Sequence, residues 1–198
     1  LASARTLEET LNNILDLNQA EVGHLELHRE TFLVREALAD VLAPLALKAS
    51  GEGKAVTSHV DPDVPEGLFG DAERLRRVIT NLAVKALELS GPDGIKVDIS
   101  VHSRSGDEVE LLQRITIRGN DRAAEELNAI LDVAREAEGM GAHRTRSDLG
   151  VAVAARLVGV VGGRLWVEQG PGSDCAICIL CSVDSRSGDD QLARRTRV

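Results

Sequence analysis

Aromatic residues are almost absent from this chain of 198 residues, which has two Phe, one Trp and no Tyr. Basic residues are also in the minority, because 23 Lys and Arg stand against 32 Asp and Glu and leave a formal net charge of -9. A protein that binds nucleic acid neutralises phosphates with a basic face, and one that binds single strands adds aromatic rings for stacking. The composition therefore predicts that the chain does not bind nucleic acid.

Long apolar runs and a signal sequence are missing as well. No run approaches the roughly 20 apolar residues that span a bilayer, so we expect no membrane insertion by this chain. Three cysteines are too few for a disulfide scaffold, and an odd count is typical of a reducing compartment, which predicts a cytoplasmic location. The chain begins at Leu1 rather than at Met, and we interpret it as a piece of a longer protein.

A narrow apolar stripe marks the first periodic segment, from Thr6 to Val22. Its members recur at steps of three and four residues on an otherwise polar helix: Leu7, Leu11, Ile14, Leu15 and Val22. Such a stripe is typical of a seam between helices, so we expect the helix to pair with a second copy in a homodimer. Packing on its own domain is the alternative.

Helices and strands are mixed through the rest of the chain. Apolar periodicity predicts helices over 33–49, 71–90, 123–136 and 149–161. Alternation predicts a short strand at Leu25 and Leu27 and further strands over 55–60, 95–101, 109–117, 164–168 and 174–183. We expect Phe32 to open the first of these helices, Asp71 to cap the second, and Arg104 to Asp107 to form a turn. This order predicts an α+β fold with helices on one face of a sheet.

Several fragments, in their order and spacing, resemble one family. They are Asn13-Ile14-Leu15-Asp16-Leu17, Glu21-Val22-Gly23-His24-Leu25, Phe32 with Arg35-Glu36-Ala37-Leu38, Asp61-Pro62-Asp63-Val64-Pro65, Gly70-Asp71, Arg74-Leu75-Arg76-Arg77-Val78, Asn81-Leu82, Leu149-Gly150-Val151-Ala152-Val153, and Gly162-Gly163-Arg164-Leu165-Trp166-Val167-Glu168. Together they resemble the C-terminal region of sensor histidine kinases, which joins a second dimerisation helix to an ATP-binding domain.

The resemblance implies a Bergerat-type (histidine kinase-like ATPase) two-layer sandwich of a mixed sheet and helices, preceded by a dimerisation helix. It divides the chain into that helix over 1–24, an ATPase domain over 25–184 and a flexible tail over 185–198. The family's phospho-accepting His sits in an acidic, Thr or Asn, and Pro-Leu context. None of the five histidines has that context, so we expect an acceptor, where there is one, upstream of this chain; the five are His24, His28, His59, His102 and His143.

The resemblance also implies an Asn that ligates Mg²⁺ from the helix after Asp71. Asn81, Leu82 and Ala86 of that pattern are present, but Lys85 occupies the position of the metal ligand. An ammonium group has no lone pair, whereas Mg²⁺ requires oxygen ligands. Two alternatives follow: Lys85 touches a phosphate as a point charge, or it is a solvated lysine on the helix surface.

The adenine-binding motif of the family, an Asp followed by two spaced glycines, is replaced by Gly119, Asp121 and Ala123. The hydrogen-bond acceptor for adenine is thus lost, and so are two glycines that allow close backbone approach. A shifted register would make Asp121 the acceptor, but no glycines follow it there.

The phosphate-binding loop of the family is glycine-rich and opens a helix, whereas this chain has Arg146-Ser147-Asp148-Leu149-Gly150-Val151. Asp148 replaces a glycine, and its carboxylate would repel phosphate oxygens. The simpler interpretation of Asp148 is the N-cap of a helix that begins at Leu149. Arg146 offsets part of the charge.

All three motifs depart from the family pattern, so we predict a pseudokinase with no catalytic residues and no cofactor. Its role would be a signal-transduction output module of a two-component-like sensor, acting as a homodimer and docking a partner. One alternative is a divergent but active kinase that binds ATP and Mg²⁺, with Lys85 and Arg146 on the phosphates, and phosphorylates an upstream His. Another is a phosphotransfer or scaffold protein that docks a response-regulator receiver domain on the dimerisation helices.

The spacing of Cys175, Cys178 and Cys181 matches part of an iron–sulfur run, but a fourth ligand is missing. On a strand Cys175 and Cys181 would face one side and Cys178 the other. We therefore predict buried core thiols and no metal site.

Overall fold

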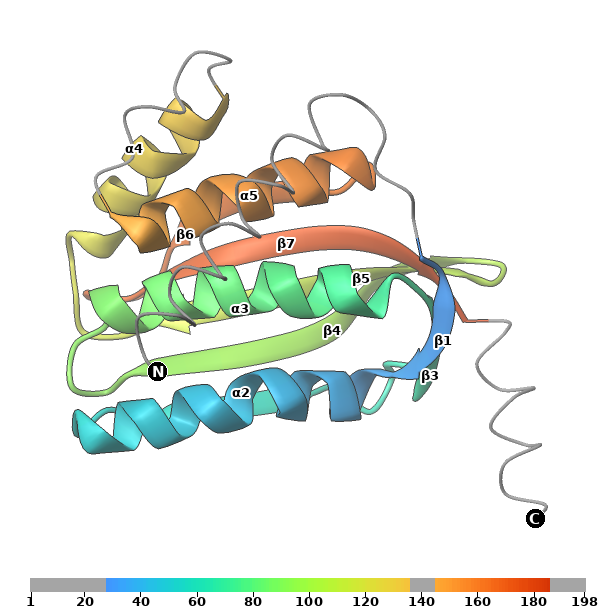
Figure 1. Cartoon of the computed structure of the whole chain (residues 1–198), viewed down its shortest axis with the longest axis horizontal. Helices are drawn as coiled ribbons and strands as arrows, with labels where there is room; N and C mark the ends of the chain where they lie inside the picture. Colours follow the sequence, from blue (N-terminus) through green and yellow to red (C-terminus); the bar gives the residue numbers. More distant parts are fainter. Residues whose placement is uncertain (1–27, 136–144, 186–198) are drawn as a thin grey trace, which may run out of the picture.

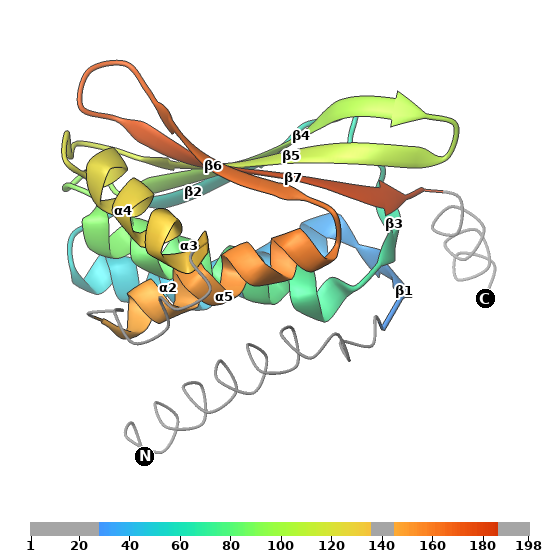
Figure 2. The ribbon, with the colours of Figure 1, turned by 90° about the horizontal axis from the view of Figure 1, so that it is seen from above.

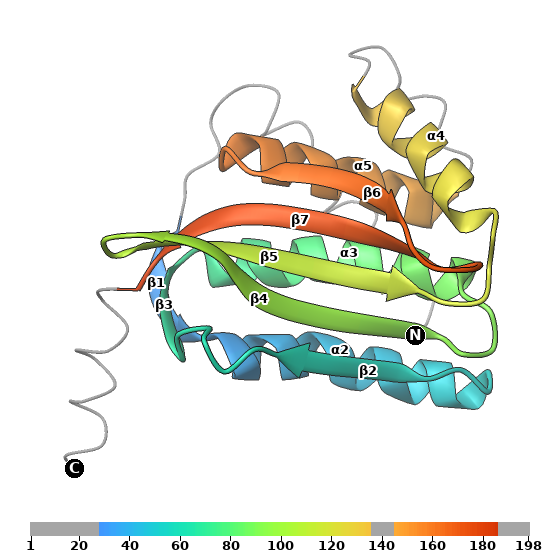
Figure 3. The ribbon, with the colours of Figure 1, turned by 180° about the vertical axis from the view of Figure 1, so that it is seen from behind.

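The computed structural model describes residues 28–135 and 145–185, which form a seven-stranded sheet and a layer of helices (Figure 1). In chain order the elements are β1 Glu30–Leu33, α2 Val34–Gly51, β2 Val56–Val60, β3 Gly67–Gly70, α3 Ala72–Leu89, β4 Ile95–Ser105, β5 Glu108–Ile117, α4 Ala123–Arg135, α5 Arg146–Val160, β6 Arg164–Gln169 and β7 Cys175–Asp184. The described helices lie on one side of the sheet (Figure 2), and none of them covers its other face (Figure 3). The predicted α+β fold is confirmed.

The sheet is mixed, as predicted. Its strands follow the order β1-β3-β7-β5-β4-β2, and β6 pairs with β7. β2 runs parallel to β4, whereas β4–β5, β5–β7 and β6–β7 are antiparallel pairs. A parallel pair needs a long crossover connection, which β3 and α3 provide here.

Aliphatic side chains fill the space between the two layers. Alternate residues of the central strands face the helices, among them Ile95, Val97 and Ile99 of β4 and Ile115 and Ile117 of β5, which are all buried. Each helix packs an apolar face against the sheet. On α3 this face includes Val78, Ile79, Leu82, Ala83 and Ala86. The core therefore forms almost without aromatic rings.

Asp71 caps α3 as predicted, because its side chain accepts a hydrogen bond from the backbone N–H of Arg74 at 3.0 Å. The predicted helices and strands between residues 33 and 183 are found within a few residues of their expected bounds. The helix of Thr6 to Val22, with its seam, and the strand at Leu25 and Leu27 lie outside the described residues.

Two predictions about local structure are wrong. Phe32 does not open a helix but lies in β1, which pairs antiparallel with the unpredicted β3. Four-residue strands are too short to show alternation, and β3 has glycine at both ends, a residue depleted in strands. The turn predicted from Arg104 is also shorter, because β4 continues to Ser105 after a register shift between Val101 and Ser103. The exposed, polar end of β4 carries no apolar pattern that would have predicted it.

Candidate functional site

Two of the three positions that depart from the family pattern meet at one end of the helix layer, where α5 packs against α3 and α4 (Figure 1). Lys85 lies near the C-terminal end of α3, Asp148 in the first turn of α5, and Glu126 in the first turn of α4. The predicted site positions Lys85 and Asp148, distant in sequence, are thus brought into contact. Glu126 joins them, although no sequence motif marks it.

Lys85 is buried and ion-paired, so the prediction of a solvated helix lysine is wrong. Only 4% of the residue is exposed. Its Nζ lies 2.8 Å from Oδ1 of Asp148 and 2.7 Å from Oε1 of Glu126. Asp148 is also buried, whereas the Glu126 side chain is half-exposed. The ammonium group is therefore occupied by two carboxylates of the chain itself; we call Lys85, Glu126 and Asp148 the charge cluster.

The charge cluster holds both of its buried members in their ionised forms. Burial acts to lower the pKa of Lys85, but the hydrogen bonds and charges of Asp148 and Glu126 outweigh it and raise the pKa above its ordinary value. Burial acts to raise the pKa of Asp148, but hydrogen bonds from Lys85 and Thr145 outweigh it and lower that pKa below its ordinary value. At neutral pH the pair is therefore a buried ammonium and a buried carboxylate.

Asp148 has a second role that corrects its predicted one. The N-cap of α5 is Thr145, not Asp148, and Asp148 is the third residue of the helix. The Thr145 hydroxyl accepts from the Asp148 N–H at 3.2 Å, and the Asp148 carboxylate accepts from the Thr145 N–H at 3.0 Å. This reciprocal pair is a capping box, which satisfies two donors that a helix start leaves open. An acidic side chain thus occupies the helix N-terminus where the family's loop would receive a phosphate.

Ser147 ties the same turn to α3. Its hydroxyl is buried and donates a hydrogen bond to Oε2 of Glu88. Arg146 is the first residue of α5, but its side chain lies outside the described structure, so its predicted charge compensation stays a prediction.

The end of β5, where the family binds adenine, is occupied by backbone contacts. Gly119 has a φ of +71°, and its N–H donates to Oδ1 of Asp174 at 3.1 Å. A Cβ added at the neighbouring Gly91 would lie 2.7 Å from the Gly119 carbonyl oxygen, so the two backbones are in close contact. The Asn120 side chain donates to the carbonyl of Leu89 at 2.6 Å and ties this turn to the end of α3. These contacts fix the turn after β5 to the end of α3 and to the residue before β7.

The remaining predicted positions are placed as follows. Asp121 is exposed, and Ala123 is fully buried at the start of α4. Gly150 of α5 packs against Asn81 of α3, since a Cβ there would lie 3.4 Å from the Asn81 side chain. Asn81 therefore contacts α5, and its Nδ2 is buried without a hydrogen-bond partner among the described residues.

The charge cluster does not fit a magnesium ion. The position of the expected metal ligand holds a cation, and Mg²⁺ binds carboxylate, carbonyl and water oxygens. In the described part of the chain, no group of three or more His, Cys, Asp and Glu side chains is arranged to hold a metal.

The three cysteines alternate along β7 as predicted, in a segment where Cys175 and Cys181 pair with Ile117 and Leu111, and Cys178 with Arg114. Cys175 and Cys178 are buried, and Cys181 is partly so. Burial raises the pKa of all three thiols to about 11.

Among the described residues, no helix combines the length and apolar character needed to cross a bilayer.

Known proteins share both the sequence pattern and the fold. Residues 70–184 match the family of histidine kinase-, DNA gyrase B- and HSP90-like ATPases. The sensor protein GacS of Pseudomonas syringae pv. syringae is 28% identical over 171 residues, which are 86% of this chain and 19% of that protein. The histidine-protein kinase BarA of Escherichia coli K12 is 26% identical over 170 residues, 85% of this chain and 18% of BarA. The chain thus spans about a fifth of the length of these relatives.

Solved structures of histidine kinases have a fold similar to that of this chain. The crystal structure of full-length ShkA in complex with AMPPNP has a TM-score of 0.71 and 20% identity, and the match covers 91% of this chain and 36% of ShkA. The Acinetobacter baumannii histidine kinase AdeS has a TM-score of 0.67 and 16% identity, with 92% of this chain and 81% of AdeS covered. These matches confirm the predicted resemblance to sensor histidine kinases and the Bergerat-type fold.

Proposed function

We propose that this chain, which belongs to the family of histidine kinase-, DNA gyrase B- and HSP90-like ATPases, is a signalling module that does not bind ATP. The observation that carries the proposal is the charge cluster. Lys85 stands at the position of the metal ligand and is neutralised by Asp148 from the phosphate-loop helix. A fold alone does not license an activity, so the site decides the proposal.

Two physical arguments support the loss of nucleotide binding. The first is the cost of opening the site: a phosphate that approached α5 would meet the Asp148 carboxylate at the helix N-terminus, and freeing Lys85 for it would leave that carboxylate buried without a counter-ion. The second is the loss of adenine recognition, because Gly119 has no side-chain acceptor.

The relatives, a sensor protein and a signal transduction histidine-protein kinase, support a role of the module in signalling. We infer that it forms a homodimer through the stripe of Leu7, Leu11, Ile14, Leu15 and Val22 and relays a signal from an upstream input domain to a docked partner. A response-regulator receiver domain is the first partner to test. A shift of the dimer helix would then reposition the kinase-like domain without any transfer of phosphate.

Calorimetry of the whole chain tests the proposal. We expect no binding heat with AMPPNP and Mg²⁺ up to about 1 mM ligand, with ShkA as the positive control. Affinity in the micromolar range for the wild-type chain would overturn the proposal. If that affinity were lost in Lys85→Ala but kept in Lys48→Ala, which changes an exposed lysine of α2, the lysine would be acting on phosphates as a divergent kinase requires.

A further inference from the structure

Three strands of the sheet have a free edge in the described part of the chain, because β1, β2 and β6 each pair with a single neighbour. A free edge presents unpaired backbone groups, and proteins ordinarily guard it with charged side chains, prolines, bulges or a short strand. β1 is short and carries Glu30, and β6 carries Arg164 and Glu168. β2 has no Lys, Arg, Asp, Glu or Pro, and its register with β4 is continuous. Among the described strands, β2 is therefore the one with an unguarded edge.

The backbone groups that β2 presents at this edge follow from its bonds to β4. The carbonyl of Ala55 accepts from the N–H of Ile95, and the N–H of Asp61 donates to the carbonyl of Ile99, both at 2.9 Å. In a parallel pair alternate residues bond to the same neighbour, so the odd-numbered residues from 55 to 61 face β4. The N–H and C=O groups that point to the free edge are those of the residues in between: Val56, Ser58 and Val60.

These groups match the same edge of a second copy of the chain. In an antiparallel pair of two β2 strands about a two-fold axis at Ser58, Val56 lies opposite Val60 of the second copy, and Ser58 lies opposite its own counterpart. Such opposed residues exchange both of their N–H···O bonds, so every backbone group at the edge finds a partner. On the other face Thr57 lies opposite His59 of the second copy; both are exposed, and no like charges meet.

α2 adds apolar and charged groups to the same rim of the molecule. It is joined to β2 by a short turn and packs beneath it, as Figure 1 and Figure 3 show. Its exposed face carries Ala39, Ala43 and Leu47 at successive turns, and Leu47 is 79% exposed. The two-fold axis makes the two α2 helices antiparallel, which brings the exposed Asp40 in the first half of one helix towards the exposed Lys48 in the last turn of the other. The charges of two copies are thus complementary at this rim.

We propose that two copies of this chain associate through the free edges of β2, which joins their sheets into one. A strand of five residues and one helix face make a small interface, so the contact is weak and forms at about 100 µM or above. The contact uses neither the charge cluster nor the stripe over residues 7–22, so it goes beyond the signalling function proposed above and is independent of it. Where the stripe also pairs, two different two-fold contacts in one chain link dimers into larger assemblies.

Sedimentation equilibrium of the full chain tests the pairing in a Leu11→Asp/Leu15→Asp background, which removes the stripe as a second contact. We expect mostly monomer at about 5 µM and mostly dimer at about 500 µM. Ser58→Pro removes an N–H that points to the free edge and no bond to β4, so the dissociation constant should rise at least about tenfold. Ser58→Ala keeps that N–H and is the matched control. A folded background chain that stays monomeric at about 500 µM, or equal constants for the two variants at Ser58, would overturn the proposal.

Cysteine cross-linking locates the contact without a change to the backbone of β2. The pairing places Thr57 opposite His59 of the second copy, and both side chains are exposed. In the same background, a mixture of Thr57→Cys and His59→Cys chains should form the mixed disulfide about tenfold faster than a mixture of Thr57→Cys and Glu125→Cys chains, because Glu125 is exposed on α4, away from β2. Mass spectrometry identifies the products. Equal rates in the two mixtures would show that β2 does not pair with itself and would refute the proposal.

Discussion

Lys85 differs in charge from the metal ligand that the family has at this position, and two carboxylates of the chain contact it. At a position where the family has a metal ligand, the ammonium group is buried and held by Asp148 and Glu126. The departure from the motif was visible in the sequence because a motif is local. The contacts among Lys85, Glu126 and Asp148 were not visible in the sequence, since the three residues lie on three different helices. Glu126 in particular carries no sequence signal that distinguishes it from its neighbour Glu125.

Removing the cation should be costly. We expect Lys85→Met to lower the free energy of unfolding by about 3 kcal/mol, because Asp148 then stays buried without its counter-ion. Urea unfolding followed by circular dichroism measures the change. The double variant Lys85→Met/Asp148→Asn should recover at least half of the loss, since no charge is left stranded.

Lys48→Met is the matched control for that series. Lys48 is exposed in the last turn of α2, and its replacement should change stability by less than about 0.5 kcal/mol. Equal effects at the two lysines would show that the buried pair does not stabilise the fold.

Acid should weaken the same pair. The pKa of Asp148 lies below its ordinary value of 3.8 in the folded chain, so its contribution to stability is present above that value and is lost as pH falls through the folded pKa. The stability difference between wild type and Asp148→Asn should therefore be largest near neutral pH and shrink below about pH 4. Urea unfolding at a series of pH values measures it; a difference that does not change with pH would contradict the ion pair.

At the scale of elements, the helices and long strands were predictable because each shows its own period of apolar residues. α3 and β5 are clear cases, with one apolar face on the helix and strict alternation on the strand. β1 and β3 were not predictable, because they are short and exist through pairing with each other. The start of α5 was misplaced by three residues for a related reason: both Thr145 and Asp148 are good cap residues, and only the structure shows that they cap reciprocally.

The cap of α5 provides a prediction at this scale. Thr145→Ala should destabilise the protein by about 1 kcal/mol, because the Asp148 N–H loses its acceptor at the helix start. Thr145→Ser keeps a hydroxyl there and should stay within about 0.5 kcal/mol of wild type. Thermal unfolding of the two variants compares them, and a loss as large in Thr145→Ser would rule out the hydroxyl as the cause.

The cysteines of β7 provide a second prediction at the scale of elements. The three thiols have pKa values of about 11, so at about pH 8 only about one in a thousand is a thiolate. We expect the folded chain to resist iodoacetamide, whereas the chain in concentrated urea should take up three labels at the rate of free cysteine. Mass spectrometry counts the labels. Rapid modification of the folded chain would show that β7 opens readily.

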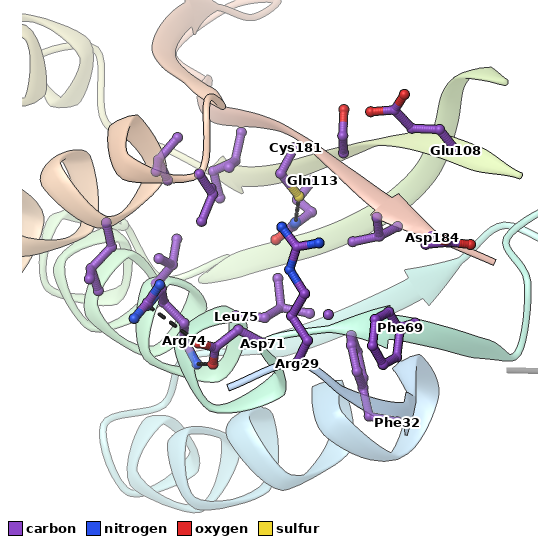
Figure 4. Close-up of a pocket in the computed structure, with 18 of the residues that line it drawn as sticks. Arg29, Phe32, Phe69, Asp71, Arg74, Leu75, Glu108, Gln113, Cys181 and Asp184 are labelled. Atoms are coloured by element: carbon purple, nitrogen blue, oxygen red, sulfur yellow. Dashed lines mark hydrogen bonds and ion pairs between the residues drawn. The ribbon is translucent and has the colours of Figure 1, made fainter. Parts of the chain in front are cut away.

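At the scale of the whole molecule, the fold has two ends with different chemistry. One end carries the charge cluster and the turn at Gly119, and the other carries a cavity of about 690 Å³ between the N-terminal turns of α3, the C-terminal turns of α5 and the sheet (Figure 4). The resemblance to a family predicted the first end through its motifs. Nothing in the sequence predicted the second, because its lining comes from separate helices and strands and from a single buried glutamine.

The association of two chains is the remaining prediction at this scale. The stripe over residues 7–22 predicts a homodimer, so Leu11→Asp with Leu15→Asp should convert the dimer to a monomer, because charges in an apolar seam are strongly disfavoured. Light scattering after gel filtration measures the mass. Asn12→Asp, off the stripe, is the control and should leave the dimer intact; a wild-type monomer would contradict the prediction.

The pairing of Lys85 with Asp148 also restricts the routes that evolution can take from this sequence. Lys85→Asn alone leaves an uncompensated carboxylate, and Asp148→Gly alone leaves Lys85 without its buried counter-ion and removes one half of the capping box. Each first step towards a metal-binding site thus passes through a less stable protein, and selection purges such intermediates. Under the function proposed above, a return to nucleotide binding would therefore require both changes together.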